Sequence, residues 1–535
     1  MLPIIPLDVS LPVPLAPLEV KWAAALGRDY THGNDVQALI DGPDALQAIY
    51  EAIETTNGNS HFIYLLAWWL ELDLPLLTDK KDTTLRVLLE KKAAAGVQIR
   101  VMVWRNLGKG KRAKDTPEQI KQIIDAGQNL DDFIRKIGSD PEALSGREPL
   151  DPKAIVDWVN TLPRAAAILD FYTATPLCSH HQKLLCVLGR KGLIATCGGV
   201  DVNKDRVDVV TPGKGEPLHD VHCAVRGPAA ADLVQVFIQR WDGHPSSKKR
   251  DREKGPLLGR GVKSIGSEPT RGQIVGPKPT REQTVRILTT YNAPYPYPTP
   301  IPPACKMERT TREGLLGAIK SARKFIYFED QYLVSMTIAD ALRSALKNIQ
   351  FVIALVPASQ ISDLPQVWKR RKEFIEHVDP LGGSFRVYYL WDPQTKNFGK
   401  RTHVHAKTWI FDDELAYVGS ANVNNRGLSS DSEVGILVTD KRWAARPPYG
   451  FTHALRMRLW REHLGIDIVD AVHGWDAWDK PTPASRVLSY NRDADKDPDI
   501  YLKVSWEYID PDMEHLPKCT KLGQPKRLRE VGHGR

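Results

Sequence analysis

Apolar runs and amphipathic stretches alternate along the first half of the chain. Residues 44–53 and 85–95 carry apolar positions at helical spacing, whereas 61–67 and 97–104 are short, nearly continuous apolar runs. Short apolar runs between helical patterns are typical of strands in β-α-β units. We therefore predict helices at the first two ranges and strands at the second two, in a mostly parallel sheet.

The same order recurs in the second half. Helical patterns alternate with apolar runs at 313–321, 324–329, 338–347 and 351–356. Each half then closes with an aromatic-rich helical pattern, at 229–241 and 453–460. An internal repeat of about one domain length indicates two copies of one folding unit. The predicted fold class is α/β, with two fused, homologous α/β sandwich domains related by a pseudo-twofold axis.

Pro, Gly and charge clusters set the predicted domain boundaries. The chain divides into a proline-rich N-terminal segment, a first repeat with an insertion, a flexible basic linker, a second repeat and a C-terminal extension, at residues 1–32, 33–244 (insertion 106–162), 245–282, 283–480 and 481–535. The insertion is charged, and insertions of this kind often form lids or walls above a site.

Composition narrows the class of partner. The 535 residues carry a formal net charge of +8, which suits an anionic partner such as phospholipid headgroups or nucleic acid. The six cysteines form no Cys-x-x-Cys pair, so a zinc site is not expected. No apolar stretch reaches the roughly 18 residues of a membrane span, and the N-terminus lacks the pattern of a cleaved signal. We expect a cytoplasmic location, or export without a cleaved signal, with peripheral membrane contact.

One short motif occurs once in each half. His181-Gln182-Lys183 and His405-Ala406-Lys407 each stand at the start of an apolar, strand-like run. Each run is followed by a turn of small residues, Gly198-Gly199 in the first half and Gly419-Ser420 in the second. Two matching copies are far more specific than one, so we predict that both copies meet in an active site at the domain interface.

Two histidines and two lysines together suit phosphodiester cleavage through a covalent intermediate. A neutral imidazole can attack phosphorus, and a charged one can protonate the leaving alcohol. The lysines would hold the phosphate oxygens, which leads us to expect neither a metal nor a cofactor. Asp220 and Glu433 stand where they could orient the two imidazoles. Asn203 and Asn422, beyond the small-residue turns, could bind phosphate oxygens or orient the lysines.

With these motifs in order, residues 33–465 resemble the phospholipase D superfamily, whose members carry paired His-x-Lys-x4-Asp motifs. The second copy fits fully, as His405, Lys407 and Asp412 followed by Gly419-Ser420-Ala421-Asn422. Two further segments are similar to phospholipase segments, namely Glu329-Asp330-Gln331-Tyr332 and Leu218-His219-Asp220-Val221-His222. The first copy departs from the pattern, because Leu188 stands where the family has Asp.

The resemblance implies a role for each matching residue. His181 would be the nucleophile and His405 the general acid, with Glu433 paired to His181 and Asp220 to His405. The predicted substrate-binding group is Asn203, Asn422, Ser420, Asp412 and Glu329. Since the motif Asp supports a loop, we expect Leu188 to affect local order more than chemistry, and Leu188→Asp to leave activity unchanged or raised.

The implied activity is that of a phospholipase D, which cleaves the headgroup phosphodiester of glycerophospholipids through a phosphohistidine and can also transfer the phosphatidyl group to an alcohol. Three alternatives stay open: a cardiolipin or phosphatidylserine synthase, a nuclease of the same superfamily, and a non-catalytic lipid-binding module. The expected partner is a phospholipid membrane surface, with no obligatory nucleic acid. We expect a monomer, since both half-sites lie in one chain.

Overall fold

The computed structural model describes most of both halves of the chain. The described residues are 18–77, 80–104, 152–170, 179–206, 218–244, 246–260, 283–291, 308–358, 367–380, 382–391, 402–440, 449–480, 482–490 and 510. Most of the predicted insertion at 106–162 therefore lies outside the described residues.

The first half follows the predicted alternation closely. Its elements are β1 (Thr31–Ile40), α3 (Asp41–Glu54), β2 (Phe62–Ala67), α4 (Leu85–Ala94), β3 (Gln98–Trp104), α7 (Pro152–Thr161), β4 (Ala165–Asp170), β5 (Leu184–Gly189), β6 (Gly192–Gly198), the 3-10 turn η2 (Lys204–Arg206), β7 (Leu218–His219), β8 (Val221–Arg226), α8 (Pro228–Gly243) and α9 (Ser247–Lys254). The four ranges predicted first correspond to α3, β2, α4 and β3 within a few residues.

The second half repeats this order. Its elements are β9 (Gln283–Tyr291), β10 (Glu308–Arg309), α10 (Thr310–Ser321), β11 (Phe325–Glu329), α11 (Met336–Ala345), β12 (Phe351–Leu355), α12 (Val367–Val378), β13 (Phe385–Leu390), β14 (His403–Val404), β15 (Thr408–Phe411), β16 (Leu415–Gly419), α13 (Asn425–Ser429), β17 (Glu433–Asp440), α14 (Phe451–Leu464), α15 (Ala471–Gly474), η4 (Trp475–Trp478) and β18 (Val487–Ser489).

One sheet of 16 strands runs through the described part of the molecule. Its order is β18-β13-β12-β11-β15-β16-β17-β9-β1-β8-β6-β5-β2-β3-β4, with β10 beside β9. Outward from the β9–β1 pair the two arms correspond strand by strand, since β17, β16, β15, β11, β12 and β13 occupy the positions of β8, β6, β5, β2, β3 and β4. The fold is α/β with two matching arms, while the pseudo-twofold axis itself stays a prediction.

The prediction of a mostly parallel sheet was wrong. Only the outer strands of each arm pair in parallel, as in β2–β3, β3–β4, β11–β12 and β12–β13, and the central strands pair antiparallel. The reason is the length of the connections. The hairpins β5–β6 and β15–β16 are closed by very short turns, whereas a parallel pair needs a crossover of about a dozen residues.

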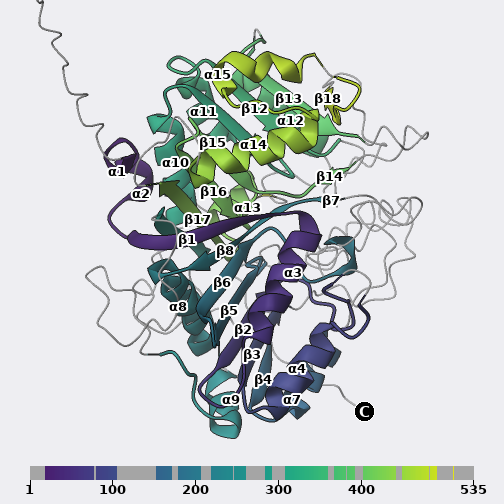
Figure 1. The fold of residues 1–535 in the computed structure, drawn as a ribbon. Helices are drawn as coiled ribbons and strands as arrows, with labels where there is room; N and C mark the ends of the chain where they lie inside the picture. Colours follow the sequence, from purple (N-terminus) through teal and green to yellow (C-terminus); the bar gives the residue numbers. More distant parts are fainter. Residues whose placement is uncertain are drawn as a thin grey trace, which may run out of the picture.

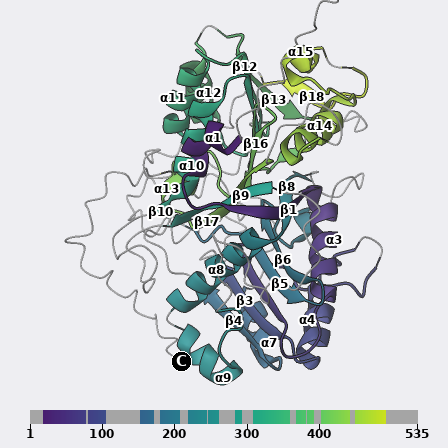
Figure 2. The ribbon, with the colours of Figure 1, turned by 60° about the vertical axis from the view of Figure 1, so that its left-hand side comes forward.

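Helices cover both faces of the sheet in each half (Figures 1 and 2). In the first half, α3, α4 and α7 lie on one face and α8 and α9 on the other; in the second, α10, α11 and α12 lie opposite α14 and α15. One hydrophobic cluster is continuous from Phe237 on α8 to Leu459 on α14, so the core is shared between the halves. Among the described helices, none is both long and apolar enough to cross a membrane.

Two predicted boundary segments contain helices that dock on the two halves. Within the predicted N-terminal segment, α1 (Leu18–Lys21) and α2 (Ala23–Leu26) bury Trp22 against the second half. The predicted flexible linker begins with α9 and an extended stretch docked on the first half. There Arg100 donates to the carbonyl of Gly255 at 2.5 Å, and Tyr64 donates to that of Leu258 at 2.9 Å. These buried donors hold residues 246–260 against the sheet, so the prediction of a flexible linker was wrong for that stretch.

Candidate active site

Both motif histidines lie at the seam between the halves. His181 precedes β5 and His405 precedes β15, and each backbone is bonded to the opposite half. The His181 N–H donates to the carbonyl of Ser432 at 2.9 Å, and the His405 N–H donates to that of His219 at 2.8 Å. A short parallel pair, β7 with β14, reinforces the second contact. The fold therefore brings the two His-x-Lys motifs to one place although they lie far apart in sequence.

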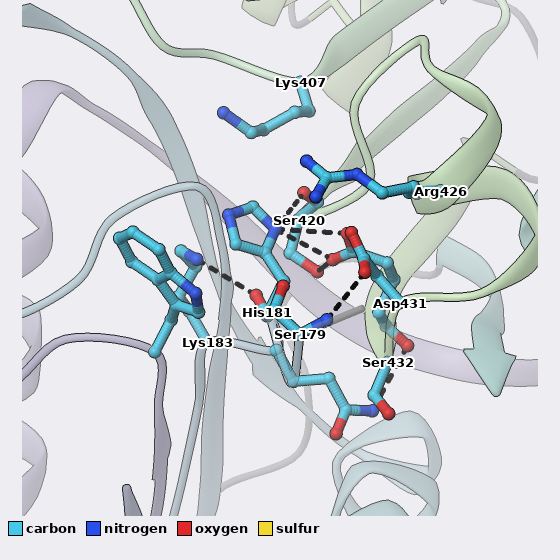
Figure 3. Close-up of polar contacts among 12 residues, drawn as sticks. Ser179, His181, Lys183, Lys407, Ser420, Arg426, Asp431 and Ser432 are labelled. Carbon is cyan, nitrogen blue, oxygen red and sulfur yellow. Dashed lines mark hydrogen bonds and ion pairs between the residues drawn. The ribbon is translucent and has the colours of Figure 1, made fainter. Parts of the chain in front are cut away.

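His181 is held by groups of the second half (Figure 3). Its Nδ1 lies 3.1 Å from each carboxylate oxygen of Glu433 and 3.0 Å from the carbonyl oxygen of Ser420. The Ser420 hydroxyl donates to Glu433 in turn, and Trp68 packs edge-on against the imidazole at 5.6 Å between ring centroids. Because a carbonyl oxygen only accepts, Nδ1 carries the proton and Nε2 keeps its lone pair. Among the described residues, none hydrogen-bonds to that Nε2.

His405 is held by the first half. Its Nδ1 lies 2.7 Å from Oδ2 of Asp220, whose other oxygen accepts the Val221 N–H at 2.8 Å. A glycine is required beside this pair, since a Cβ on Gly199 would lie 1.9 Å from Oδ1 of Asp220. The structure thus joins each histidine to a carboxylate of the opposite half, in the crosswise pairing that the resemblance implies.

The two motif lysines lie beside their own histidines and are almost fully buried. Lys183 donates to the His181 carbonyl at 3.0 Å and lies 3.2 Å from Oδ2 of Asp201. Lys407 donates to the His405 carbonyl and lies 3.4 Å from Oε1 of Gln331. Burial lowers the pKa of Lys407 to about 8, although Asp220 and Asp330 oppose the effect. Both ammonium groups lie close enough to His181 to lower its pKa.

Burial dominates the electrostatics of the histidine–carboxylate pairs. It lowers the pKa of both imidazoles well below the ordinary value, and the nearby Lys183 adds to this at His181 while Arg206 does so at His405. Burial raises the pKa of Asp220 to about 6, against the opposing effect of Lys407. It raises the pKa of Glu433 to about 7, against the opposing effect of Lys183. Burial and the neighbouring cations therefore favour neutral imidazoles at both positions.

Three known proteins and one family model are similar to this chain. Residues 315–451 match the family model described as "Cardiolipin synthase, PLD-like domain". Phospholipase D alpha 1 from Cynara cardunculus is 23% identical over 577 aligned residues, covering 85% of this chain and 67% of the relative. For phospholipase D alpha 1 from Arabidopsis thaliana the identity is 24%, over 86% of this chain and 68% of the relative. Phosphatidylserine synthase from Haemophilus influenzae Rd KW20 aligns at 13% identity and a TM-score of 0.48, over 79% of this chain and 87% of that chain.

The chain resembles the phospholipase D superfamily, through the PLD-like domain match at residues 315–451 and a distant similarity to plant phospholipases D over 85–86% of its length. Enzymes of this superfamily act on phosphodiester bonds, and the relatives named above align along both halves. The roles of individual residues in this chain stay predictions, which the geometry now makes specific.

Aligning the small-residue turns of the two halves changes which first-half residue corresponds to Asn422. Gly198 and Gly419 end β6 and β16, and the residues three positions later are Asp201 and Asn422. Asp201, rather than Asn203, is therefore the first-half counterpart of Asn422. Asp201 accepts the Trp68 N–H at 3.1 Å and pairs with Lys183. Counting from the turn, instead of looking for an Asn, would have found it.

Asn203 and Asn422 nevertheless keep unused hydrogen-bonding capacity. Asn203 is 1% exposed, and both polar atoms of its side chain lack partners among the described residues. Within the same ranges, Oδ1 of Asn422 is also without a partner. Buried polar atoms without partners are uncommon, and a bound ligand is one way to satisfy them. The expectation that they bind substrate stays open on these grounds.

For two of the predicted substrate contacts the structure indicates another role. Asp412 accepts the backbone N–H groups of Arg323, Lys324 and Phe325 at 2.8–2.9 Å and pairs with Lys21, so its carboxylate fixes the start of β11. Glu329 is fully buried, with its oxygens on His219 and His463 at 2.9 Å each. Both carboxylates are used within the fold. The prediction that they bind substrate is therefore corrected.

Two arginines were missed by sequence reasoning. Arg426, on α13, points toward His181 and Asp431 (Figure 3), and its charge acts to lower the pKa of both Asp431 and Glu433. Arg206, on η2, places Nη2 3.3 Å from Nε2 of His405. Each arginine thus faces the histidine of the opposite half, as the carboxylates do. Their shared signal is an Arg seven or eight residues after the small-residue turn in both halves.

The C-terminal extension contributes one described contact to this region. Asp510 is buried and its carboxylate accepts the N–H groups of Asn425 and Arg426 at 2.9 and 2.8 Å. A carboxylate that accepts the first free N–H groups of a helix stabilises that end. Asp510 thereby fixes the helix that carries Arg426.

Two groups of histidine and carboxylate side chains in the described residues have the atom types that bind metals, and both groups include His219. His219, Glu329 and His463 form one, and Asp41, His219 and Glu462 the other, each with atoms within 4.8 Å of one another. In both groups the atoms are joined by internal contacts, since His219 reaches Asp41 at 2.8 Å and Glu329 at 2.9 Å. We describe them as a buried ionic network rather than as a metal centre.

Proposed function

We propose that this protein is a phospholipase D, which hydrolyses the headgroup phosphodiester of glycerophospholipids to phosphatidate and a free alcohol. The observation that carries the proposal is the crosswise pairing of two histidines with two buried carboxylates, His181 with Glu433 and His405 with Asp220. The names of the plant relatives, which align with 85–86% of this chain, favour a phospholipid over other phosphodiesters.

In the first chemical step, Nε2 of His181 attacks phosphorus. The P–N bond forms as the P–O bond to the headgroup breaks, and His405 supplies a proton from Nε2 to the departing alcohol. Glu433 keeps the proton of His181 on Nδ1, so that the lone pair of Nε2 faces the substrate. His181 suits the attack better than His405, because Nε2 of His405 is engaged by Arg206.

In the second step, water attacks the phosphohistidine. Nε2 of His405 takes the proton of that water, the P–N bond breaks, and the imidazole of His181 is restored. A primary alcohol in place of water would give a phosphatidyl-alcohol by the same route.

Lys183 and Lys407 would hold the non-bridging oxygens throughout both steps. A charge at about 4 Å contributes on the order of 4 kcal/mol at an effective dielectric near 20. Because both lysines are buried, this attraction is less weakened by water and salt than on an open surface. Access to phospholipids implies contact with a membrane surface, which is part of the proposal.

The test uses purified protein, mixed phospholipid vesicles and a short primary alcohol, with and without a chelator. We expect phosphatidate and phosphatidyl-alcohol by mass spectrometry, and a phosphorylated peptide containing His181 after acid quench. His181→Asn and His405→Asn should lose at least about 10²-fold in rate. His473→Asn is the matched control, since the His473 side chain is 83% exposed and lies on α15.

Other products would point elsewhere. Headgroup exchange without hydrolysis would favour a synthase-type transferase. Absence of lipid products from the folded protein, together with cleavage of DNA, would favour a nuclease. Absence of any turnover would favour a lipid-binding module, and it would contradict the proposed activity.

A further inference from the structure

Arg206 occupies an unusual position for a buried arginine. It is 1% exposed and places Nη2 3.3 Å from Nε2 of His405, the nitrogen that must carry the proton for the leaving alcohol. Its Nε has no partner among the described residues. A guanidinium only donates hydrogen bonds, so this contact requires a lone pair on Nε2. The resting geometry therefore excludes the protonated form that a general acid needs.

The backbone around Arg206 is built to keep it there. A Cβ on Gly42 would lie 1.5 Å from the Arg206 carbonyl oxygen, so only glycine allows α3 to pack this closely on η2. The Arg206 N–H donates to the Asn203 carbonyl at 3.1 Å, and both polar atoms of the buried Asn203 side chain lack partners within the described ranges. The turn thus presents a guanidinium and an unsatisfied amide on one short segment.

We propose that Arg206 gates the general acid, by holding Nε2 of His405 unprotonated in the empty site and releasing it when a phosphodiester takes over the guanidinium. On binding, the phosphate oxygens accept the hydrogen bonds of Arg206, and Nε2 takes a proton from solvent. That proton then passes to the headgroup oxygen as the P–O bond breaks. This inference rests on the proposed function and adds a residue that touches the reacting nitrogen.

The charges around His405 agree with this sequence of events. Titratable and charged groups face it from both halves, namely Arg206 on η2, Asp220 between β7 and β8, Lys183 before β5, and His403 and Lys407 around β14. After burial, Arg206 is the largest contribution that lowers the pKa of His405. An anion between Arg206 and the imidazole would reverse that contribution, because opposite charges favour the protonated form.

The arrangement also separates the two imidazoles chemically. Both donate through Nδ1 to a carboxylate, yet only His405 has an arginine on Nε2 among the described contacts. The free Nε2 of His181 suits attack on phosphorus. The Nε2 of His405, which contacts Arg206, suits a proton donor that becomes charged only when substrate is bound. The contact with Arg206 therefore keeps His405 unprotonated until a substrate is bound.

The experiment follows the imidazole of His405 by NMR in protein labelled with carbon-13 at histidine Cε1. The His405 signal is identified by its loss in His405→Asn, and inorganic phosphate serves as the anion. We expect saturating phosphate to raise the pKa of His405 in the wild-type protein. In Arg206→Gln without phosphate, the proton affinity of His405 should rise at least about tenfold. Arg206→Lys keeps the charge and should retain the low pKa.

Equal His405 titrations in the wild type and in folded Arg206→Gln, or no response of the wild type to phosphate, would overturn the inference. If Arg206→Gln does not fold, the wild-type phosphate titration and Arg206→Lys still decide. Arg458→Gln is the control, because the Arg458 side chain is 49% exposed and contacts Asp44. Lipid turnover is measured separately. If the wild type cleaves lipid but its His405 pKa does not respond to phosphate, only this inference is wrong. If the His405 pKa responds but no lipid is cleaved, only the proposed function is wrong.

Discussion

At the scale of single residues, the site depends on polar groups that are useful because they are buried. His405 and Asp220 are buried, where an unpaired charge costs free energy, so the imidazole and the carboxylate share one proton. The same burial that lowers the pKa of the imidazoles raises the pKa of their carboxylate partners. A small change in charge, such as the arrival of a phosphate, can therefore shift where the proton resides.

Glu433→Gln tests the pair at His181. Gln cannot hold the imidazolium charge that develops at His181, so we expect turnover to fall by roughly 10²-fold or more. Phospholipid turnover at pH 7 measures this loss, and Glu90→Gln, an exposed residue on α4, is the control. Activity equal to that of the wild type would contradict the predicted role of Glu433.

The same variant has a predictable effect on stability. The pKa of Glu433 is raised from 4.5 to about 7, so between these values the folded protein binds more protons than the unfolded chain. The free energy of unfolding of the wild type should therefore fall as pH rises through this window, and the penalty is complete above it. Glu433→Gln lacks this penalty. Its melting temperature relative to the wild type should rise from pH 5 to pH 8, and a gap that stays constant would count against the buried charge.

At the scale of elements, different contacts support the two hairpins that carry the His-x-Lys motifs. In β15–β16, Asp412 and Asp413 form the turn with positive φ values of 58° and 60°, and the Asp412 carboxylate fixes the start of β11. In β5–β6, the strand continues through Leu188, which pairs with Phe62 on β2. Backbone pairing thus supplies in the first half the support that a carboxylate supplies in the second.

Leu188→Asp tests this difference. The sequence led us to expect unchanged or raised activity, but Leu188 is partly buried against the main core. A carboxylate there would lose apolar contact and gain no backbone donors, so we now expect a loss of about 1–3 kcal/mol in stability. Turnover of the remaining folded protein should be unchanged. Urea unfolding monitored by fluorescence measures the first, and a more stable variant would show that the carboxylate finds donors.

At the scale of the whole molecule, the site exists only because two arms of one sheet meet. The β1–β9 and β7–β14 pairs join the halves, and a buried ionic network crosses the same seam. In it, His219 of the first half lies between Asp41 and Glu329, and Glu329 also contacts His463 of the second half. His219 lies next to Asp220, so the network positions the carboxylate that orients His405.

Glu329→Gln should weaken this seam. The pKa of Glu329 is lowered strongly, so its contribution to stability is present above about pH 4.5 and lost as pH falls. The pKa of His219 is raised, so its contribution is complete below about pH 6.5 and lost as pH rises through the raised value. Between these limits we expect Glu329→Gln to lose about 3–5 kcal/mol, because it leaves a buried imidazolium without one partner.

Urea unfolding at pH 6 measures this loss. Asp467→Asn is the matched control, since it breaks an ion pair with Arg461 that lies on the surface, where the effect should be near zero. A loss in Glu329→Gln no larger than that of the control would mean that the network does not hold the seam.

Much of this molecule was predictable from its sequence. Local periodicity predicted α3, β2, α4 and β3 and their counterparts, because a helix or strand repeats its burial pattern over a few residues. The duplicated His-x-Lys motif predicted His181, Lys183, His405 and Lys407 as candidate site residues, since the same residues at matching places in a repeat are rarely accidental. Asp220 and Glu433 followed from the need of each imidazole for a partner.

Tertiary structure decided what depends on contacts across the seam. Strand direction, the structural roles of Asp412 and Glu329, and the approach of Arg206 to His405 are set by pairings between residues far apart in the chain. Local pattern carries no record of such pairings, because the partner atoms come from the other half. The sequence by itself therefore predicted the histidines, lysines and paired carboxylates of the candidate site, and only the packing of the two arms decided which residues touch and added the arginines.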